Sequence, residues 1–116
     1  MKYKNLFFLT LLICQNLFGQ TQIGSDVDGD NIQDYFGSSV AISDDGLTFA
    51  AGAQGSLVDG NTTGNYAKVY SYSNNAWQIV GSKINGPSGS ENFGHAVALS
   101  SDGTILAVGD RKGGAN

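Results

Sequence analysis

The chain has 116 residues, of which 41% are hydrophobic and 14% are charged, and its formal net charge is −4. Two of the six basic residues lie within the first four positions, so the rest of the chain sets four basic residues against ten acidic ones. An acidic surface disfavours nucleic acid and anionic lipid as partners, because both reward basic patches. The composition therefore excludes these two classes of function, and the charge serves solubility.

Residues 1–20, "MKYKNLFFLTLLICQNLFGQ", have the layout of a secretory signal peptide. Lys2 and Lys4 form a basic start, and residues 6–14 form an apolar run. This run is about half of the roughly 20 residues that a membrane-spanning helix needs, and no second apolar run follows it. We therefore predict that residues 1–20 are a signal peptide, that the mature chain has no membrane span, and that it is secreted or held at the cell surface.

Cys14 is the only cysteine, and it lies inside the predicted signal peptide. The mature protein would then hold neither a disulfide nor a thiol nucleophile. A lipid anchor on Cys14 is disfavoured, because Leu12 and Ile13 stand where small residues are needed.

The stretch 26–37, "DVDGDNIQDYFG", places four aspartates within nine residues. Counted from the first aspartate, carboxylates fall at positions 1, 3, 5 and 9, and a backbone carbonyl is available at position 7, which is the spacing that calcium loops use. Position 12 is Gly37, where a bidentate acid would normally complete the shell. The candidate calcium ligands are Asp26, Asp28, Asp30, Ile32 and Asp34. The alternative hypothesis is a solvated acidic seam between two copies of a repeated unit.

An internal repeat supports the second hypothesis, that the acidic stretch joins two copies of a repeated unit. Sliding the sequence by 57 residues aligns residues 24–59 with residues 81–116 without a gap, and 12 of the 36 aligned pairs are identical. "FGSSVAISDDGLTFAAGA" falls on "FGHAVALSSDGTILAVGD". The acids of the loop are not repeated, because the second copy replaces Asp26, Asp28 and Asp30 with Lys83, Asn85 and Pro87. Calcium is therefore not a requirement of every copy, and calcium binding by the first copy stays an open alternative.

Each period predicts strands and turns, with no helical periodicity. Val40 and Ile42 alternate with small residues, as in a strand, and "SDDG" at residues 43–46 predicts a tight turn. Residues 54–65 are polar and rich in glycine and asparagine, which predicts a surface loop. The four strands expected in one period are residues 36–43, 47–53, 66–73 and 76–84.

Four short strands in a repeat of about 57 residues predict an all-β fold made of four-stranded antiparallel blades of an incomplete β-propeller. Two copies of a short motif in the sequence also resemble a known repeat. Phe36-Gly37 and Phe93-Gly94, each followed by a Val-Ala strand and then by "AAGA" or "AVGD", resemble the FG-GAP repeat of the integrin α-subunit N-terminal propeller. The "SDDG" and "SSDG" turns are similar to those of repeats in secreted bacterial surface proteins.

The resemblance covers residues 24–116. It implies that residues 21–116 contain the end of one blade, one full blade and the start of the next. In the family, calcium lies between the first two strands of a blade. Residues 43–46 and 100–103 stand at those places as turns too short to surround an ion that needs six to eight oxygens, so this calcium site does not transfer.

A propeller closes with typically four to eight blades, more than this chain can supply. An incomplete stack would leave apolar blade faces exposed to water. We therefore expect the chain to be a fragment of a longer protein, with further blades of the same chain as partners. If the chain is complete, we expect it to self-associate.

No residue pattern predicts catalysis. His95 is the only histidine and is expected to have a structural role, no zinc cluster can form, and no G-x-S-x-G motif occurs. The aromatic side chains of the strands, which include Trp77, are expected to pack between blades in preference to lining a carbohydrate or peptide surface.

We therefore predict a non-catalytic extracellular or cell-surface binding or adhesion module. Its ligand would be a protein or a glycan, and residues 54–65 would make the contact. The alternative is a scaffold or accessory domain of a larger exported enzyme whose active site lies beyond residue 116.

Overall fold

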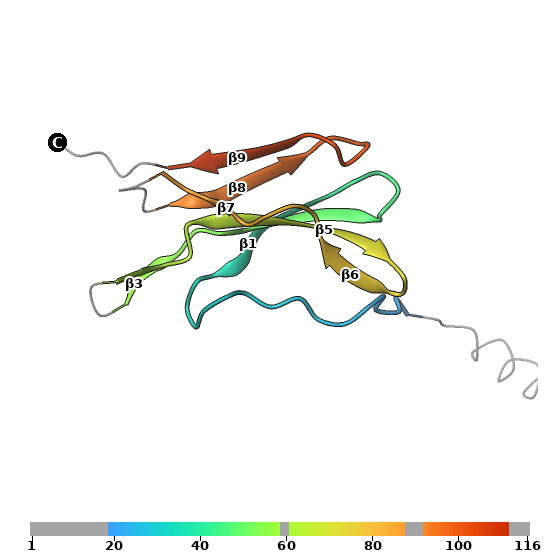
Figure 1. The fold of residues 1–116 in the computed structure, drawn as a ribbon, viewed down its shortest axis with the longest axis horizontal. Helices are drawn as coiled ribbons and strands as arrows, with labels where there is room; N and C mark the ends of the chain where they lie inside the picture. The colour runs from blue at the N-terminus through green and yellow to red at the C-terminus, as the bar shows by residue number, and fades with distance from the viewer. Residues whose placement is uncertain (1–18, 59–60, 88–91, 112–116) are drawn as a thin grey trace, which may run out of the picture.

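A computed structural model describes residues 19–58, 61–87 and 92–111 (Figure 1). Most of the predicted signal peptide and Glu91, which aligns with Asp34 in the repeat, lie outside these ranges. The described residues form antiparallel sheets without a helix, which confirms the predicted all-β class. Within these ranges there is consequently no helix long and apolar enough to span a bilayer.

The largest sheet contains the four strands that the sequence predicts. Their order across the sheet is also their order along the chain, and neighbours are antiparallel: β1 (Phe36–Ile42), β2 (Thr48–Ala53), β5 (Tyr66–Ser73) and β6 (Ala76–Ile79). The predicted turn joins β1 to β2. In it, Ser43 Oγ donates to Asp45 Oδ1 at 2.6 Å, and Gly46 takes a φ of 72°. A side chain at that φ would be strained, so glycine suits the position.

The last predicted strand, residues 76–84, is divided in two. β6 pairs with the second half of β5, whereas β7 (Ile84–Asn85) pairs with Tyr66 and Ala67 at the start of β5. Gly81, with a φ of 70°, bends the chain between the two pieces. Two short strands therefore share one edge of β5.

The predicted loop at residues 54–65 is wrong in one respect, because it contains a hairpin. β3 (Ser56–Val58) and β4 (Asn61–Thr63) pair antiparallel as a separate two-stranded sheet that projects from the main sheet (Figure 1). Gly55, Gly64 and Asn65 have φ values of 78°, 88° and 58°, and these turn the chain out of β2 and back into β5. The sequence of this segment does not predict these strands, because apolar and polar residues do not alternate in it.

A second hairpin repeats the geometry of the first. β8 (Phe93–Leu99) and β9 (Leu106–Asp110) pair with a register that matches that of β1 and β2 at an offset of 57 residues, including the irregularity after the first pair. Gly37 and Gly94 at these irregularities have φ values of 84° and 87°. The turn is also repeated, since Ser100 Oγ donates to Asp102 Oδ1 at 2.6 Å.

The β8–β9 hairpin lies on the main sheet, with β8 in contact with β1 and β2 (Figure 1). Ser39 Oγ donates to the carbonyl of Gly94 at 2.8 Å, and Asp44 N donates to the carbonyl of Ser101 at 2.9 Å. A Cβ on Gly52 would collide with the Gly94 carbonyl, so this approach requires glycine. In the described part of the chain, the sheets close into neither a barrel nor a propeller.

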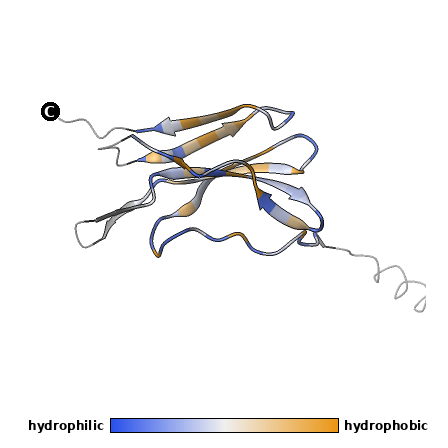
Figure 2. Cartoon of the chain, in the orientation of Figure 1, coloured by the Kyte–Doolittle hydropathy of each residue, from blue (hydrophilic) through white to orange (hydrophobic). Residues whose placement is uncertain are grey.

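The core combines small residues with aromatic rings. The buried apolar residues are Ala50, Ala51, Ala53, Tyr66, Ala67 and Tyr70. Phe49 stacks on Tyr70 with centroids 5.1 Å apart and meets Trp77 edge-on at 4.8 Å. The strand aromatics therefore contact one another across the sheet. Figure 2 shows hydrophobic residues along the strands and hydrophilic residues in most of the connecting segments.

Candidate functional site

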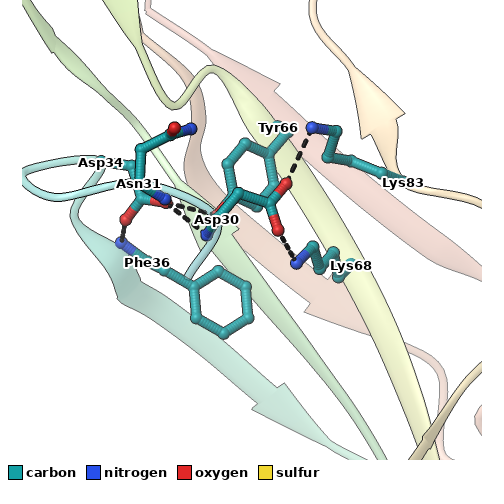
Figure 3. A network of polar contacts seen from close by, with 7 residues as sticks. All are labelled: Asp30, Asn31, Asp34, Phe36, Tyr66, Lys68 and Lys83. Carbon is teal, nitrogen blue, oxygen red and sulfur yellow. Dashed lines mark hydrogen bonds and ion pairs between the residues drawn. The ribbon is translucent and has the colours of Figure 1, made fainter. Parts of the chain in front are cut away.

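The acidic loop, residues 26–35, directly precedes β1. It is organised around Asp34, which is only 4% exposed. Its carboxylate accepts backbone N–H bonds from Asp30, Asn31 and Phe36 at 2.9, 3.0 and 2.9 Å (Figure 3). The Tyr66 hydroxyl donates a further bond to Asp34 at 2.5 Å and accepts one from Asp30 N at 2.9 Å. Asp34 therefore closes its own loop and attaches it to β5.

Two lysines flank the carboxylate of Asp30 (Figure 3). Lys68 Nζ, from β5, contacts Oδ1, and Lys83 Nζ, from the segment before β7, contacts Oδ2 at 2.8 Å. Lys68 is buried, and its ammonium also lies 5.4 Å from the ring centroid of Phe36 and 5.2 Å from that of Tyr66. A buried ammonium needs such partners, because removal from water is costly.

These contacts shift the pKa values of both aspartates. Hydrogen bonds from Lys68 and Lys83 outweigh burial and lower the pKa of Asp30 below 3.8. Burial by itself raises the pKa of Asp34, but the bonds from Tyr66 and the three backbone N–H groups together lower it below 3.8. Burial and the bond to Asp34 raise the pKa of the Tyr66 phenol. The network therefore holds two carboxylates ionised beside a neutral phenol.

The candidate calcium ligands take separate roles in this arrangement. Asp30 and Asp34 are bonded as described above, and Asp26 accepts a bond from Gln22 Nε2 at 2.8 Å. Asp28 is exposed, and Ile32 is 88% exposed. In the described ranges, no three His, Cys, Asp or Glu side chains gather in a way that could hold a metal ion. Calcium binding by this loop stays a prediction, and the ammonium groups already neutralise Asp30.

Sequence reasoning missed the basic half of this network. Lys83 entered the sequence comparison only as the residue that replaces Asp26 in the second copy, yet it lies against Asp30 of the first copy. A signal for Lys68 was present, because it alternates with Tyr66 and Tyr70 on one face of β5. A lysine on the aromatic face of a strand indicates an anionic partner.

The β3–β4 hairpin is anchored beside this network. Gly55 N donates to the carbonyl of Asp34 at 3.1 Å, which fixes the start of the hairpin to the acidic loop. A Cβ on Gly64 would meet the backbone of Gly55, so the two ends of the hairpin are in close contact. His95 Nδ1 lies 2.9 Å from Gln54 Oε1, next to the same base. This contact gives His95 a side-chain partner, and the structural role expected for it stays a prediction.

The chain matches no protein-family model, and neither a curated protein nor a solved structure matches it significantly. The resemblance to FG-GAP repeats therefore stays a prediction.

Proposed function

We propose that the chain is a non-catalytic binding or adhesion module, exported by residues 1–20 to the outside of the cell or to its surface. It is built from FG-GAP-like blades of a β-propeller. The observation that carries the proposal is the recurrence of one hairpin geometry at an offset of 57 residues, with the second hairpin stacked on the sheet that contains the first.

Stacked sheets of similar strands support a blade architecture, because each propeller blade is a small antiparallel sheet that packs on the next. The order β1–β2–β5–β6 is that of an up-and-down four-stranded blade. The β8–β9 hairpin corresponds to the first two strands of a following blade. In such a scaffold the strands are structural, and the connecting segments are free to vary for recognition.

The β3–β4 hairpin is the proposed contact surface for a protein or glycan ligand. It leaves the sheet at the junction of β2 and β5, and its base is anchored by Gly55, Gly64 and the acidic loop. A segment whose base is held by hydrogen bonds loses less conformational entropy at that base when it binds, which favours affinity. The polar residue types of positions 56–63 suit hydrogen bonding to a glycan or to a polypeptide backbone.

The test is a binding screen of the full chain against a glycan array and against immobilised collagen and fibrinogen. The informative variant removes residues 56–63, since Gly55 and Gly64 already lie together and can close the gap. We expect the variant to keep the circular dichroism spectrum of the parent and to lose at least about tenfold in affinity for any probe that the parent binds.

The matched control is Asp44→Ala, in the exposed turn at the opposite end of β2. This variant should bind as the parent does. Binding to none of the probes, or binding that survives removal of residues 56–63, would contradict the proposal.

A further inference from the structure

The two stacked layers bury unlike faces against each other. On the β8–β9 hairpin, the larger apolar residues are half-buried, whereas the small residues that alternate with them are exposed. Neighbours along a strand point to opposite faces, so the larger residues face the main sheet. Those residues are Val97, Leu99, Leu106 and Val108. The face of the β8–β9 hairpin that carries its larger apolar residues thus lies against the main sheet.

The face of the main sheet that receives them is lined by small residues. Ala41 pairs with Ala50, and Ser39 pairs with Gly52, so all four lie on one face. The contacts of Ser39 and Gly52 with Gly94 place this face against β8. Small residues allow the two backbones to approach closely. The layers therefore meet with a large-residue face on one side and a small-residue face on the other.

Each of these faces has an equivalent 57 residues away that is exposed in large part, although Ala51, the equivalent of Val108, is buried. The equivalents of Val97, Leu99 and Leu106 are Val40, Ile42 and Phe49, which line a hollow on the outer side of β1 and β2. Val40 is 67% exposed and Ile42 is 61% exposed. We define Val40, Ile42 and Phe49 as the large face.

The second exposed surface is the outer side of the β8–β9 hairpin. Its residues occupy the positions of Ser39, Ala41, Thr48, Ala50 and Gly52 in the first hairpin and are all exposed: Ala96, Ala98, Ile105, Ala107 and Gly109. Ala107 is exposed, whereas its equivalent Ala50 is fully buried under the second layer. We define these five residues as the small face.

We propose that the large face of one copy of this chain binds the small face of a second copy, in the same way as the β8–β9 hairpin packs on the main sheet. The argument is continuity with an interface that the molecule already contains. Both faces are uncharged and keep most of the residue types of this interface; the exceptions are Ile105 in place of Thr48 and Ala51 in place of Val108. The two faces differ, so the contact is heterologous, and each copy keeps one free face of each kind.

Assembly should therefore proceed beyond the dimer, into a closed ring or an open chain of copies. The acidic net charge of the copies opposes their approach, and salt screens this repulsion. Association should strengthen with salt, unlike an association held by ion pairs. This assembly is independent of the ligand contact proposed for the β3–β4 hairpin.

The experiment measures the mass of the full chain by sedimentation velocity and light scattering over a wide concentration range. The parent should form oligomers larger than a dimer as concentration rises. Val40→Lys disables the large face, and Ala107→Lys disables the small face. Both positions are exposed, so both variants should fold, which circular dichroism checks.

Mixing gives the decisive result. Each variant by itself should be monomeric. A mixture of the two should form a dimer and nothing larger, because only one intact large face and one intact small face remain to meet. Gly109→Ala adds a single methyl group at the position equivalent to Gly52, where no Cβ fits under the second layer. It should weaken association by about tenfold or more.

The matched control is Ile32→Lys, which replaces an apolar side chain that is 88% exposed but belongs to neither face. It should associate as the parent does. A parent that is monomeric at every concentration would overturn the proposal, as would a mixture that stays monomeric. Association that survives Ala107→Lys but not Val40→Lys would indicate contact between like faces and also overturns it. Association through the apolar residues 6–14 would persist in every variant, and this result would also overturn the proposal.

Discussion

Asp34 illustrates how one buried carboxylate organises a loop that has little apolar content of its own. Backbone N–H groups on both sides of it in the sequence converge on its two oxygens. Gly29 lies directly beneath, and a Cβ there would come within 2.5 Å of Asp34 Oδ1. The acidic loop is therefore held by hydrogen bonds and close backbone packing.

Replacement of Asp34 by asparagine tests this role. The amide presents one oxygen and an NH₂ group in place of the carboxylate, so some of the backbone donors lose their acceptor. We expect the free energy of unfolding to fall by about 2 kcal/mol, measured by urea denaturation. The exposed neighbour Asp28 supplies the control, because Asp28→Asn should change stability by less than about 0.5 kcal/mol. If the two substitutions lowered the free energy of unfolding equally, the Asp34 carboxylate would not be the group that organises the loop.

The lowered pKa of Asp34 also predicts a pH dependence. Its folded-state pKa lies below its ordinary value of 3.8, so its contribution is fully present above that value and is lost as the pH falls through the folded pKa. Asp30 shifts in the same direction. The free energy of unfolding should therefore decline from about pH 5 to about pH 2. The decline should be smaller in Asp34→Asn than in the parent. An identical decline in both proteins would contradict the attribution of the pH dependence to Asp34.

The two hairpin turns share one chemistry at the scale of the element. In each, a serine hydroxyl donates to the aspartate two positions on, and that aspartate accepts a backbone N–H after the glycine. The bonds from Ser100 and Thr104 lower the pKa of Asp102 to about 2. The turns differ in surroundings, because Gly103 lies against Thr48 of the first hairpin, whereas no described residue lies within 4 Å of a Cβ built on Gly46.

A pair of glycine substitutions separates turn strain from packing. Gly46→Ala should cost about 1 kcal/mol, because its φ of 72° disfavours a side chain. Gly103→Ala has the same strain at a φ of 73° and also places a Cβ 3.0 Å from Thr48 Cβ. We expect it to cost about 1 kcal/mol more than Gly46→Ala in urea denaturation. Equal losses would show that the second turn does not pack on the first hairpin.

The molecule as a whole is two layers whose spacing is set by small residues. Gly52 and Gly94 let the backbones of β2 and β8 approach, and the hydroxyl of Ser39, on β1, donates to the Gly94 carbonyl of β8. Larger side chains at these positions would separate the layers and expose the half-buried residues of the β8–β9 hairpin. The close contact is thus a property of the pair of layers, and neither hairpin requires it by itself.

Gly52→Ala and Gly109→Ala test this spacing at equivalent positions. Gly52→Ala should lower the free energy of unfolding by about 2 kcal/mol and should increase hydrogen exchange in β8 and β9. In Gly109→Ala, the nearest described neighbour of the new methyl group within one copy is Ala96, with Cβ atoms 3.3 Å apart, so the loss should be below about 1 kcal/mol. Both are measured at a concentration where the chain is monomeric. Similar losses would contradict the stacking.

The strands and turns of both hairpins were predictable because their signals are local. Val40 and Ile42 alternate with small residues, and "SDDG" contains its own hydrogen-bonding groups. The β3–β4 hairpin was not predictable, because its strands carry no apolar alternation and the chain enters and leaves it through positive φ values at its base. The break between β6 and β7 depends on Gly81 in the same way.

The all-β class, the tight turns and the similarity of residues 57 positions apart can be read from the amino-acid sequence, since these follow from neighbouring residues and from comparison of the chain with itself. Only the tertiary structure placed Lys68 and Lys83 on Asp30, 38 and 53 residues away, and the Tyr66 hydroxyl on Asp34. Contacts over such separations depend on strand register and on the way the acidic loop packs on β5. A loop with calcium-like spacing thus acquires basic partners from β5 and from the segment before β7.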